Sequence, residues 1–468
     1  MALPLQFLGG FCFSRELIWT ANEKRLSGRV EDHRRPIALG KKVARLPLFY
    51  LPEAGCEKKQ NNRRPSRTQP SVLRQLVELI PAYMVPKLAR KFGVDKRART
   101  FSAFSHVVAL VYAQLSHALS LNDICDGLRL MATPLRALRG ATPPSRNALS
   151  HANKIRDCGM AEALFWEVLT HLQDRFPRFK RGVSPRLARR FRRSIHIVDS
   201  TVIELISSCV DWANHNRRKA AIKCHLRLSL RTLLPNFAFL SSARENDVQQ
   251  VRRICTGLQR GEVLLCDRGF HLMAHFYELT QRGVFFVTRT REQILFKVVG
   301  RGARSKDPRI LKDEYVVTCG DWVKGHYPEK LRRVTARVLI DREECVLTFL
   351  TNNFSWSAGS IADLYRCRWQ IEAFFKQIKQ TLQLADFLGH SANAVKWQIW
   401  IALLVFVLLR FQAWCHDWVH SFSRLLTLLL AALWLPRDVA RLLRYGTADP
   451  HYHQLDPNAQ RWLPGVLV

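Results

Sequence analysis

The sequence predicts an α/β fold in which helices flank a mixed sheet, with a helical domain before it and a β-rich insertion within it. Two apolar, strand-like runs each carry an aspartate, Asp199 within Ser194–Ile206 and Asp267 at the end of Gly261–Asp267. No Gly or Pro interrupts Ser360–Leu388, which indicates a helix. Before residue 176 the apolar side chains recur at helical spacing. These observations place a sheet and a late helix after an all-helical segment.

Composition limits the class of protein. The chain has 468 residues, 47% of them hydrophobic, which is enough for a sizeable core. A formal net charge of +35 favours a polyanionic partner. A ribosomal or membrane-surface protein would share this charge, but the apolar fraction favours a globular protein acting on DNA. The 12 cysteines lack zinc-ligand spacing and suit a reducing cytoplasm. Met1–Phe13 lacks the basic start of a signal peptide, so none is expected.

Shifts in composition predict the domain boundaries. We expect a basic, disordered extension (1–70), a helical DNA-binding domain (71–176), an Arg-rich linker (177–193), a first core part (194–291), a β-rich insertion (292–350), a second core part (351–443) and a tail (444–468). Two apolar runs, Trp397–Leu409 and Leu425–Pro436, are shorter than the about 20 residues of a membrane span. Buried core helices are therefore expected there, with a membrane anchor over 397–436 as the alternative.

The helical domain contains a candidate recognition helix, Ser145–Arg156, whose polar residues could reach base edges or phosphates. A solvated polar face is the alternative. The candidate contacts are Arg146, Asn147, His151, Asn153 and Lys154. The other predicted helices are Ser71–Ile80, Tyr83–Phe92, Ser102–Leu119, Ser120–Leu130 and Met160–Phe176.

A second predicted strand, Lys219–Leu230, alternates so that Lys219, Lys223 and His225 share one face. That face could look toward bound phosphates, or it could be an ordinary exposed sheet face. Further strands are expected at Pro235–Ala243, Val284–Arg289, Tyr315–Thr318, Thr335–Ile340 and Glu344–Leu350, and helices at Asp247–Leu258 and His271–Gln281.

The late helix carries charged residues in a pattern suited to phosphate chemistry. With Ser360 as the expected N-cap and about 100° per residue, Tyr365, Arg368, Glu372 and Lys379 fall within a stripe of about 60°. A carboxylate among cations can bind a metal and phosphates together. A solvated Arg/Glu pair one turn apart is the alternative. Asp199, inside an apolar strand, is costly unless it is paired or bound to a metal.

The spacing Tyr365-x2-Arg368-x3-Glu372-x6-Lys379 resembles the signature of DDE transposases of the insertion-sequence-four type. Asp-Ser-Thr at 199–201 and Asp-Arg-Gly-Phe at 267–270 also resemble this family's motifs, and the resemblance runs from about Ser71 to about Phe411. It implies a ribonuclease H-like sheet. It also implies that Asp199, Asp267 and Glu372 are the catalytic residues and hold two Mg²⁺ ions, which Mn²⁺ could replace.

The resemblance implies further contacts and partners. Tyr365, Arg368 and Lys379 would contact phosphates near a transposon end, with Trp369 packing behind them and Arg268 also on DNA. The implied activity is cut-and-paste transposition: nicking, a hairpin intermediate and strand transfer. The implied partners are double-stranded terminal inverted repeats and target DNA, bound by a homodimer in a bacterial cytoplasm, at the nucleoid and without a membrane. A catalytically inactive, transposon-derived DNA-binding protein is the alternative.

Overall fold

The structure is a computed structural model. It describes residues 69–96, 100–181, 191–205, 209, 214–216, 219–290, 294–319, 325–340, 343–381 and 388–445. The expected disordered extension up to residue 68 and the tail beyond residue 445 lie outside the described residues. The expected domain boundaries therefore stay predictions.

Helices make up the N-terminal part. They are α1 (Val72–Glu78), α2 (Met84–Phe92), α3 (Ala103–Ser116), α4 (Leu121–Leu130), α5 (Ala132–Arg136), α6 (Arg146–Ile155), α7 (Gly159–Arg175) and α8 (Pro177–Arg181). Ser71, Ser102, Ser120 and Ser145 accept hydrogen bonds from the backbone at the starts of α1, α3, α4 and α6, as N-caps do. Each predicted helix of this part is confirmed, and α8 begins the segment that we expected to be a linker.

A mixed sheet forms the core. Its first strands are β1 (Ile195–Leu205), β2 (Asn214–Asn216), β3 (Lys219–Ser229), β4 (Pro235–Ser242), β5 (Val263–Cys266) and β6 (Phe285–Arg289). β3 is antiparallel to both β1 and β4, whereas β1, β5 and β6 are parallel neighbours. This order, β4-β3-β1-β5-β6, is the expected ribonuclease H-like arrangement.

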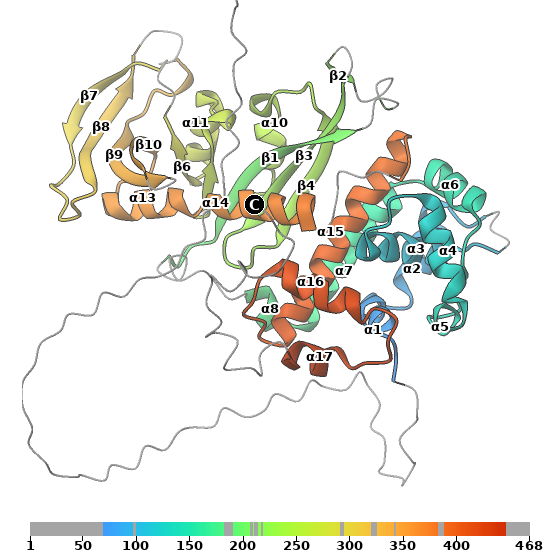
Figure 1. Ribbon diagram of the computed structural model, residues 1–468. Coiled ribbons are helices and arrows are strands. Elements are labelled where there is room, and N and C mark those ends of the chain that lie inside the picture. Colours follow the sequence, from blue (N-terminus) through green and yellow to red (C-terminus); the bar gives the residue numbers. More distant parts are fainter. Residues whose placement is uncertain are drawn as a thin grey trace, which may run out of the picture. The chain divides into compact units, whose positions relative to one another are not determined.

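The β-rich insertion continues the same sheet. It comprises β7 (Phe296–Arg301), β8 (Ile310–Thr318), β9 (Leu331–Ile340) and β10 (Glu343–Thr351). Because β10 pairs with β6, the strands run on in the order β6-β10-β9-β8-β7 (Figure 1). The insertion is thus an extension of the core sheet.

Different helices cover the two faces of the sheet. One face packs Val198, Leu264 and Phe286 against α10 (Asp247–Ile254) and α11 (Met273–Gln281). On the other face, Ile197, Leu265 and Val287 belong to the main core, with the helices that follow β10. Since side chains alternate along a strand, Asp199 shares the face of Ile197, and Ser200 shares the face of Val198.

The segment with the charged stripe is not one helix. α13 (Ala358–Arg366) is capped by Ser357 and not by Ser360, and α14 (Trp369–Lys376) follows after a turn (Figure 1). At this turn the amides of Cys367 and Arg368 bond to carbonyls three residues back, which tightens the chain. Beyond α14 the chain forms a π-helical turn, Gln377–Thr381. The predicted helix is therefore present up to Thr381 as three successive helical segments instead of one continuous α-helix, and residues 382–387 lie outside the described residues.

The C-terminal apolar runs form α15 (Ala392–Cys415) and α16 (Phe422–Ala431), followed by α17 (Val439–Tyr445). Among the described helices, α15 alone is long and apolar enough to span a membrane, with a mean hydropathy of 1.8. The bent pair α3 and α4 would pass only if counted as one span. However, 83% of the apolar window of α15 is buried, and α15 contacts α3, α6 and α7. The structure supports the core-helix interpretation.

Candidate active site

Asp199 and Asp267 emerge side by side from neighbouring parallel strands. Val198 of β1 is paired with Cys266 of β5, so each aspartate is the next residue on its strand. Both side chains belong to the face opposite α10. Carboxyl ends of adjacent parallel strands are where α/β folds build their sites. The sheet therefore brings together two carboxylates that are 68 positions apart in the sequence.

The third carboxylate arrives from α14, which contacts β1. Arg368 connects it to the strands, because its Nη2 lies 2.6 Å from Glu372 Oε1 and its Nη1 lies 3.7 Å from Asp199 Oδ2. From α13, Tyr365 donates its hydroxyl to Asp267 Oδ1 at 2.8 Å. Asp199, Asp267 and Glu372 thus converge around one guanidinium and one phenol.

Burial governs the electrostatics of this cluster. It raises the pKa of Asp199 to about 7, and Glu372 and Asp267 push that pKa in the same direction. Burial alone would lower the pKa of Arg368, but Glu372, Tyr365 and the two aspartates outweigh it and raise the pKa. Arg368 Nε is buried without a hydrogen-bond partner among the described residues. Arg368 is therefore the one cation in ion-pair contact with this cluster among the described residues, and it still has a buried N–H to donate.

The donor set suits a hard divalent cation. Three carboxylates offer only oxygen ligands, the type that Mg²⁺ and Mn²⁺ prefer over zinc-type nitrogen and sulfur sites. A cation would also stabilise the ionised form of Asp199, whose pKa is raised chiefly by burial and further by Glu372 and Asp267. Within the described ranges, no three His, Cys, Asp or Glu side chains are placed to hold a metal ion as they stand, and Arg368 lies between Asp199 and Glu372. The chemistry fits a metal, and its binding stays a prediction.

Comparisons with known proteins show the family of the chain. Residues 190–408, which include all three carboxylates, match the sequence family described as "Transposase DDE domain". The putative transposase y4zB of Sinorhizobium fredii is 30% identical over 267 residues, covering 56% of this chain and 73% of that protein. The chain belongs to the DDE transposase family.

Other similarities concern parts of this DDE-family chain. Transposase InsG for insertion sequence element IS4, from Escherichia coli, is 35% identical over 121 residues, which cover 24% of this chain and 27% of that protein. Residues 68–138 match a domain of unknown function (DUF4372). The piggyBac transposase synaptic complex with hairpin DNA covers 84% of each chain at 12% identity and a TM-score of 0.38.

The structure brings only part of the predicted signature of this transposase together. Lys379 lies in the π-helical turn and bonds farther along β1, away from the three carboxylates. Its Nζ donates to Val202 O at 2.5 Å, and burial lowers its pKa. Trp369 is 59% exposed, so the prediction that it packs behind the signature is wrong, because Ile371 and Phe375 hold the buried side of α14. Arg268 is exposed in the turn after Asp267.

Lys223 and His225 lie on the other side of the sheet. In the pairing of β1 with β3, His225 is opposite Ser200, and Lys223 is opposite Val202. Directly paired residues share a face, so both side chains point toward α10 and away from the Asp199 face. The prediction that they look toward the phosphates is wrong. Lys219 lies in β3, and its side chain is outside the described residues.

The predicted recognition helix, α6, presents most of its expected contacts. Arg146, Asn147, His151 and Lys154 are exposed on it, whereas Asn153 is buried. The Asn153 side chain bonds to His106 Nε2 at 2.8 Å, next to the buried Leu149 and Ala152. The prediction that Asn153 reads bases is therefore wrong, since it lies on the packed side of α6.

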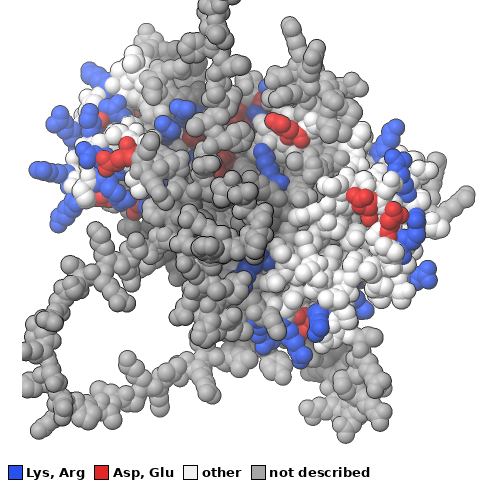
Figure 2. Space-filling model, viewed as in Figure 1, with Lys and Arg blue, Asp and Glu red and all other residues white. Residues whose placement is uncertain are grey.

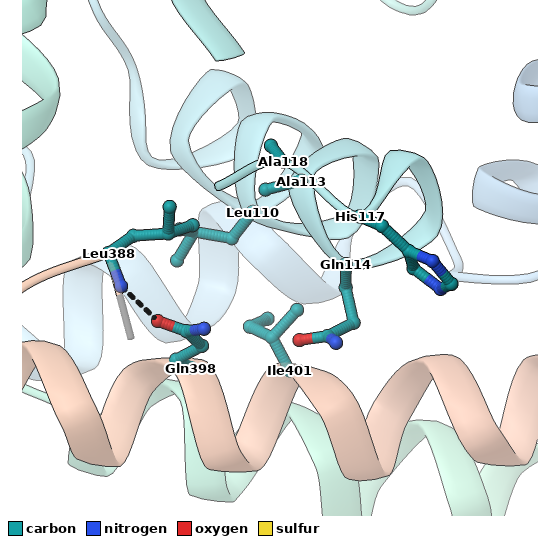
Figure 3. Close-up of a pocket in the computed structure, with 8 residues that line it drawn as sticks. All are labelled: Leu110, Ala113, Gln114, His117, Ala118, Leu388, Gln398 and Ile401. Atoms are coloured by element: carbon teal, nitrogen blue, oxygen red, sulfur yellow. Dashed lines mark hydrogen bonds between the residues drawn. The ribbon is translucent and has the colours of Figure 1, made fainter. Parts of the chain in front are cut away.

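A pocket elsewhere has no catalytic character. It lies between α3 and α15 and has only about 10 Å³ of space accessible to water, and at its edge the Leu388 amide donates to Gln398 Oε1 (Figure 3). None of the predicted site residues lines it. The lining residues are Leu110, Ala113, Gln114, His117, Ala118, Leu388, Gln398 and Ile401.

Sequence reasoning missed one residue of the site region, Asp247. It accepts a hydrogen bond from Ser200 Oγ at 2.6 Å, at the residue that follows Asp199. In the sequence Asp247 reads only as the start of a helix. The available signal was its position just after β4, because the first turn of a helix that returns across a sheet lies near the strand ends.

Proposed function

We propose that this chain is a metal-dependent, cut-and-paste DNA transposase, which cleaves DNA at transposon ends and transfers the resulting 3′ ends into target DNA. The observation that carries the proposal is the convergence of Asp199, Asp267 and Glu372 on one side of the sheet. The membership of the chain in the DDE transposase family supports the proposal. Two-cation phosphodiester chemistry requires carboxylates gathered in one place, as they are at these strand ends.

The chain's own side chains would prepare this chemistry. Asp199, Asp267 and Glu372 would hold two Mg²⁺ ions, which activate the attacking water or 3′-hydroxyl and stabilise the leaving oxygen. Tyr365 fixes one oxygen of Asp267 and so restricts its rotation. Arg368, which neutralises the carboxylates in the free protein, would exchange them for a phosphate oxygen of the DNA. Trp369, exposed beside it, would face the same DNA.

The charge of the described surface supports a DNA partner. Figure 2 shows Lys and Arg side chains gathered over β7 and β8. The acidic side chains of this hairpin, Asp307, Asp313 and Glu314, are all paired with arginines. Its exposed charged residues are accordingly all basic: Lys297, Arg301, Arg304, Lys306 and Lys312.

The reaction also implies where and with what the protein works. Two transposon ends must be cut together, so a homodimer on paired inverted repeats is part of the proposal. Acting on chromosomal DNA, the protein would work in the bacterial cytoplasm at the nucleoid. The exposed residues Arg146 and Lys154 of α6 would add contacts to the terminal repeat.

Cleavage of end DNA tests the proposal. Purified protein is mixed with a labelled duplex carrying a terminal repeat, in Mg²⁺ or Mn²⁺. We expect nicking by the wild type and none detectable by Asp199→Asn, Asp267→Asn or Glu372→Gln, because each removes one anionic ligand without changing side-chain size. Glu278→Gln, an exposed carboxylate on α11, is the matched control and should cleave as the wild type does.

Two results would overturn the assignment. Cleavage that persists in all three site variants would place the chemistry elsewhere. If the wild type and the three variants bind the repeat equally and none cleaves it, the chain is a catalytically inactive DNA-binding protein.

A further inference from the structure

Asp247 at the start of α10 contacts the segment that carries Asp199, although it lies on the opposite face of the sheet. Its Oδ1 accepts the hydroxyl of Ser200 at 2.6 Å and lies 3.3 Å from Lys223 Nζ. A hydrogen bond to a charged carboxylate is roughly twice as strong as one between neutral groups. Ser200 in turn donates its amide to Asp199 Oδ1 at 2.8 Å. Asp247 thus fixes the residue that orients the first catalytic carboxylate.

The other oxygen of Asp247, Oδ2, lies near the turn that follows Asp267. A Cβ placed on Gly269 would lie 3.8 Å from Asp247 Oδ2, so the backbone after Asp267 passes close to this oxygen. Asp267 immediately precedes that turn, Arg268–Phe270, which contacts α10. One side chain therefore bonds to the residue after Asp199 and lies near the turn after Asp267.

The surroundings of Asp247 hold it in place. Lys223, whose side chain is only 11% exposed, also donates to Glu245 O at 2.7 Å. His225 is fully buried, stacks on Phe239 and lies 3.9 Å from Asp247 Oδ1. Burial lowers the pKa of His225 to about 4, so its ring is neutral near pH 7 and Lys223 supplies the compensating charge. Two protein side chains thus fix one carboxylate oxygen, with a neutral ring beside it.

The geometry points to Asp247 as a positioning residue that sets how tightly the catalytic carboxylates bind divalent cations. By holding Ser200, whose amide bonds to Asp199 Oδ1, it restricts the orientation of the Asp199 carboxylate, and its second oxygen lies beside the turn that follows Asp267. This inference rests on the proposed metal-dependent reaction. Groups that orient metal ligands from outside the coordination sphere typically change metal affinity or activity by about 10–100-fold.

Direct metal binding tests the inference without relying on catalysis. Mn²⁺ binding to the full-length protein is measured by titration calorimetry, in parallel with the Mn²⁺ dependence of end cleavage. We expect Asp247→Ala to weaken Mn²⁺ binding by about tenfold or more and Ser200→Ala to reproduce most of that loss. Asp247→Asn keeps an acceptor for Ser200 and should fall in between, and excess Mn²⁺ should restore part of the cleavage.

Glu245→Ala is the matched control. Glu245 lies two residues before Asp247, but its side chain bonds to Gln250 at 2.6 Å. Its backbone carbonyl, which holds Lys223, remains in the variant. This variant should therefore bind Mn²⁺ as the wild type does, and equal weakening in it would contradict a specific role for Asp247.

The other outcomes are decisive as well. A lower melting temperature with unchanged Mn²⁺ affinity in the Asp247 variants would show a purely structural role. Loss of Mn²⁺ binding as complete as in Asp199→Ala would make Asp247 a ligand itself. If Asp247→Ala does not fold, unchanged affinity in Ser200→Ala overturns the inference. Wild-type protein that binds Mn²⁺ but does not cleave would refute the proposed reaction alone, whereas a lack of Mn²⁺ binding would refute both.

Discussion

Arg368 shows how a single residue can keep a carboxylate cluster folded before its ions arrive. Three carboxylates that approach one another in a protein interior repel, and burial weakens the solvation of each charge. Arg368 contacts two of them and has one buried N–H without a partner among the described residues. Arg368 thus compensates the carboxylate charges of the metal-free site only in part. A divalent cation, which carries more positive charge, would bind there readily.

The raised pKa of Asp199 predicts a pH dependence of stability in metal-free protein. An aspartate titrates near 3.9 in an unfolded chain and at about 7 here, so between these values the native state binds more protons. Stability must then fall as pH rises through this window. We expect wild-type protein in EDTA to lose stability relative to Asp199→Asn between pH 5 and pH 8, as measured by chemical denaturation.

Divalent ions give the control for this experiment. Because Mg²⁺ or Mn²⁺ binds the ionised carboxylate, adding either should flatten the wild-type pH profile and leave that of Asp199→Asn nearly unchanged. An Asn variant whose stability falls with pH as steeply as the wild type would show that another group titrates.

At the scale of elements, strands were predictable where helix continuity was not. The Asp199 strand follows from a β-branched run and the Asp267 strand from a short apolar run before a Gly turn, and their pairing follows from the family resemblance. No Gly or Pro in the sequence marks the break between α13 and α14 at Cys367–Arg368, because the break arises from backbone hydrogen bonds to carbonyls three residues back. Likewise, no residue type in the sequence indicates the π-helical turn that carries Lys379.

The faces of β3 show a related limit. Alternation correctly groups Lys223 with His225, but it does not say which face of the sheet the group occupies. That choice depends on the register with β1, where His225 pairs with Ser200. Register is a long-range property, so the sequence could not decide between the phosphate side and the α10 side.

The β7–β8 hairpin predicts a measurable electrostatic contribution to DNA binding. Lys297 and Arg301 are exposed on β7, and their hairpin carries no exposed acid among its described residues. We expect Lys297→Gln/Arg301→Gln to weaken DNA binding. The slope of log K against log salt should become less negative by about 0.9 per lost phosphate contact. Fluorescence anisotropy between 50 and 200 mM salt, roughly the range where such contacts dominate, measures this slope.

Val299→Thr is the matched control for the hairpin. Val299 lies on the same strand and is 45% exposed, and the change keeps both shape and charge. Its salt slope should equal that of the wild type. A double Gln variant with an unchanged slope would show that DNA does not lie along this hairpin.

At the scale of the molecule, α15 joins the N-terminal helices to the core. Trp397 is fully buried, donates its indole N–H to Arg156 O at 2.8 Å, and lies 4.6 Å from the His106 ring. On the same helix, Asn393 Oδ1 accepts a hydrogen bond from the Cys158 amide at 3.0 Å, and Asn393 Nδ2 donates to Asn153 O at 2.9 Å. The end of α6 is thus attached to α15 by side-chain and backbone bonds together.

This attachment predicts a large stability loss on truncation. Trp397→Ala should cost about 3–5 kcal/mol, because it leaves a cavity and removes one of the two hydrogen bonds that Arg156 O accepts from α15. Trp369→Ala is the matched control, since that side chain is 59% exposed and its loss should change stability by less than about 0.5 kcal/mol. Denaturant unfolding followed by circular dichroism measures both. Equal effects of the two substitutions would contradict the buried role of Trp397.

The docking of α6 on α15 has a consequence for how the enzyme would read DNA. A recognition helix on a flexible tether can search for its site independently of the catalytic residues. Here Asn393 and Trp397 bond to the end of α6. Any base pairs that Arg146 and Lys154 contact would therefore lie at a fixed distance from the cut. The distance from the bound repeat to the cleaved bond would then be constant, so base pairs inserted between the repeat and the original scissile bond would move the cut by the same number of base pairs.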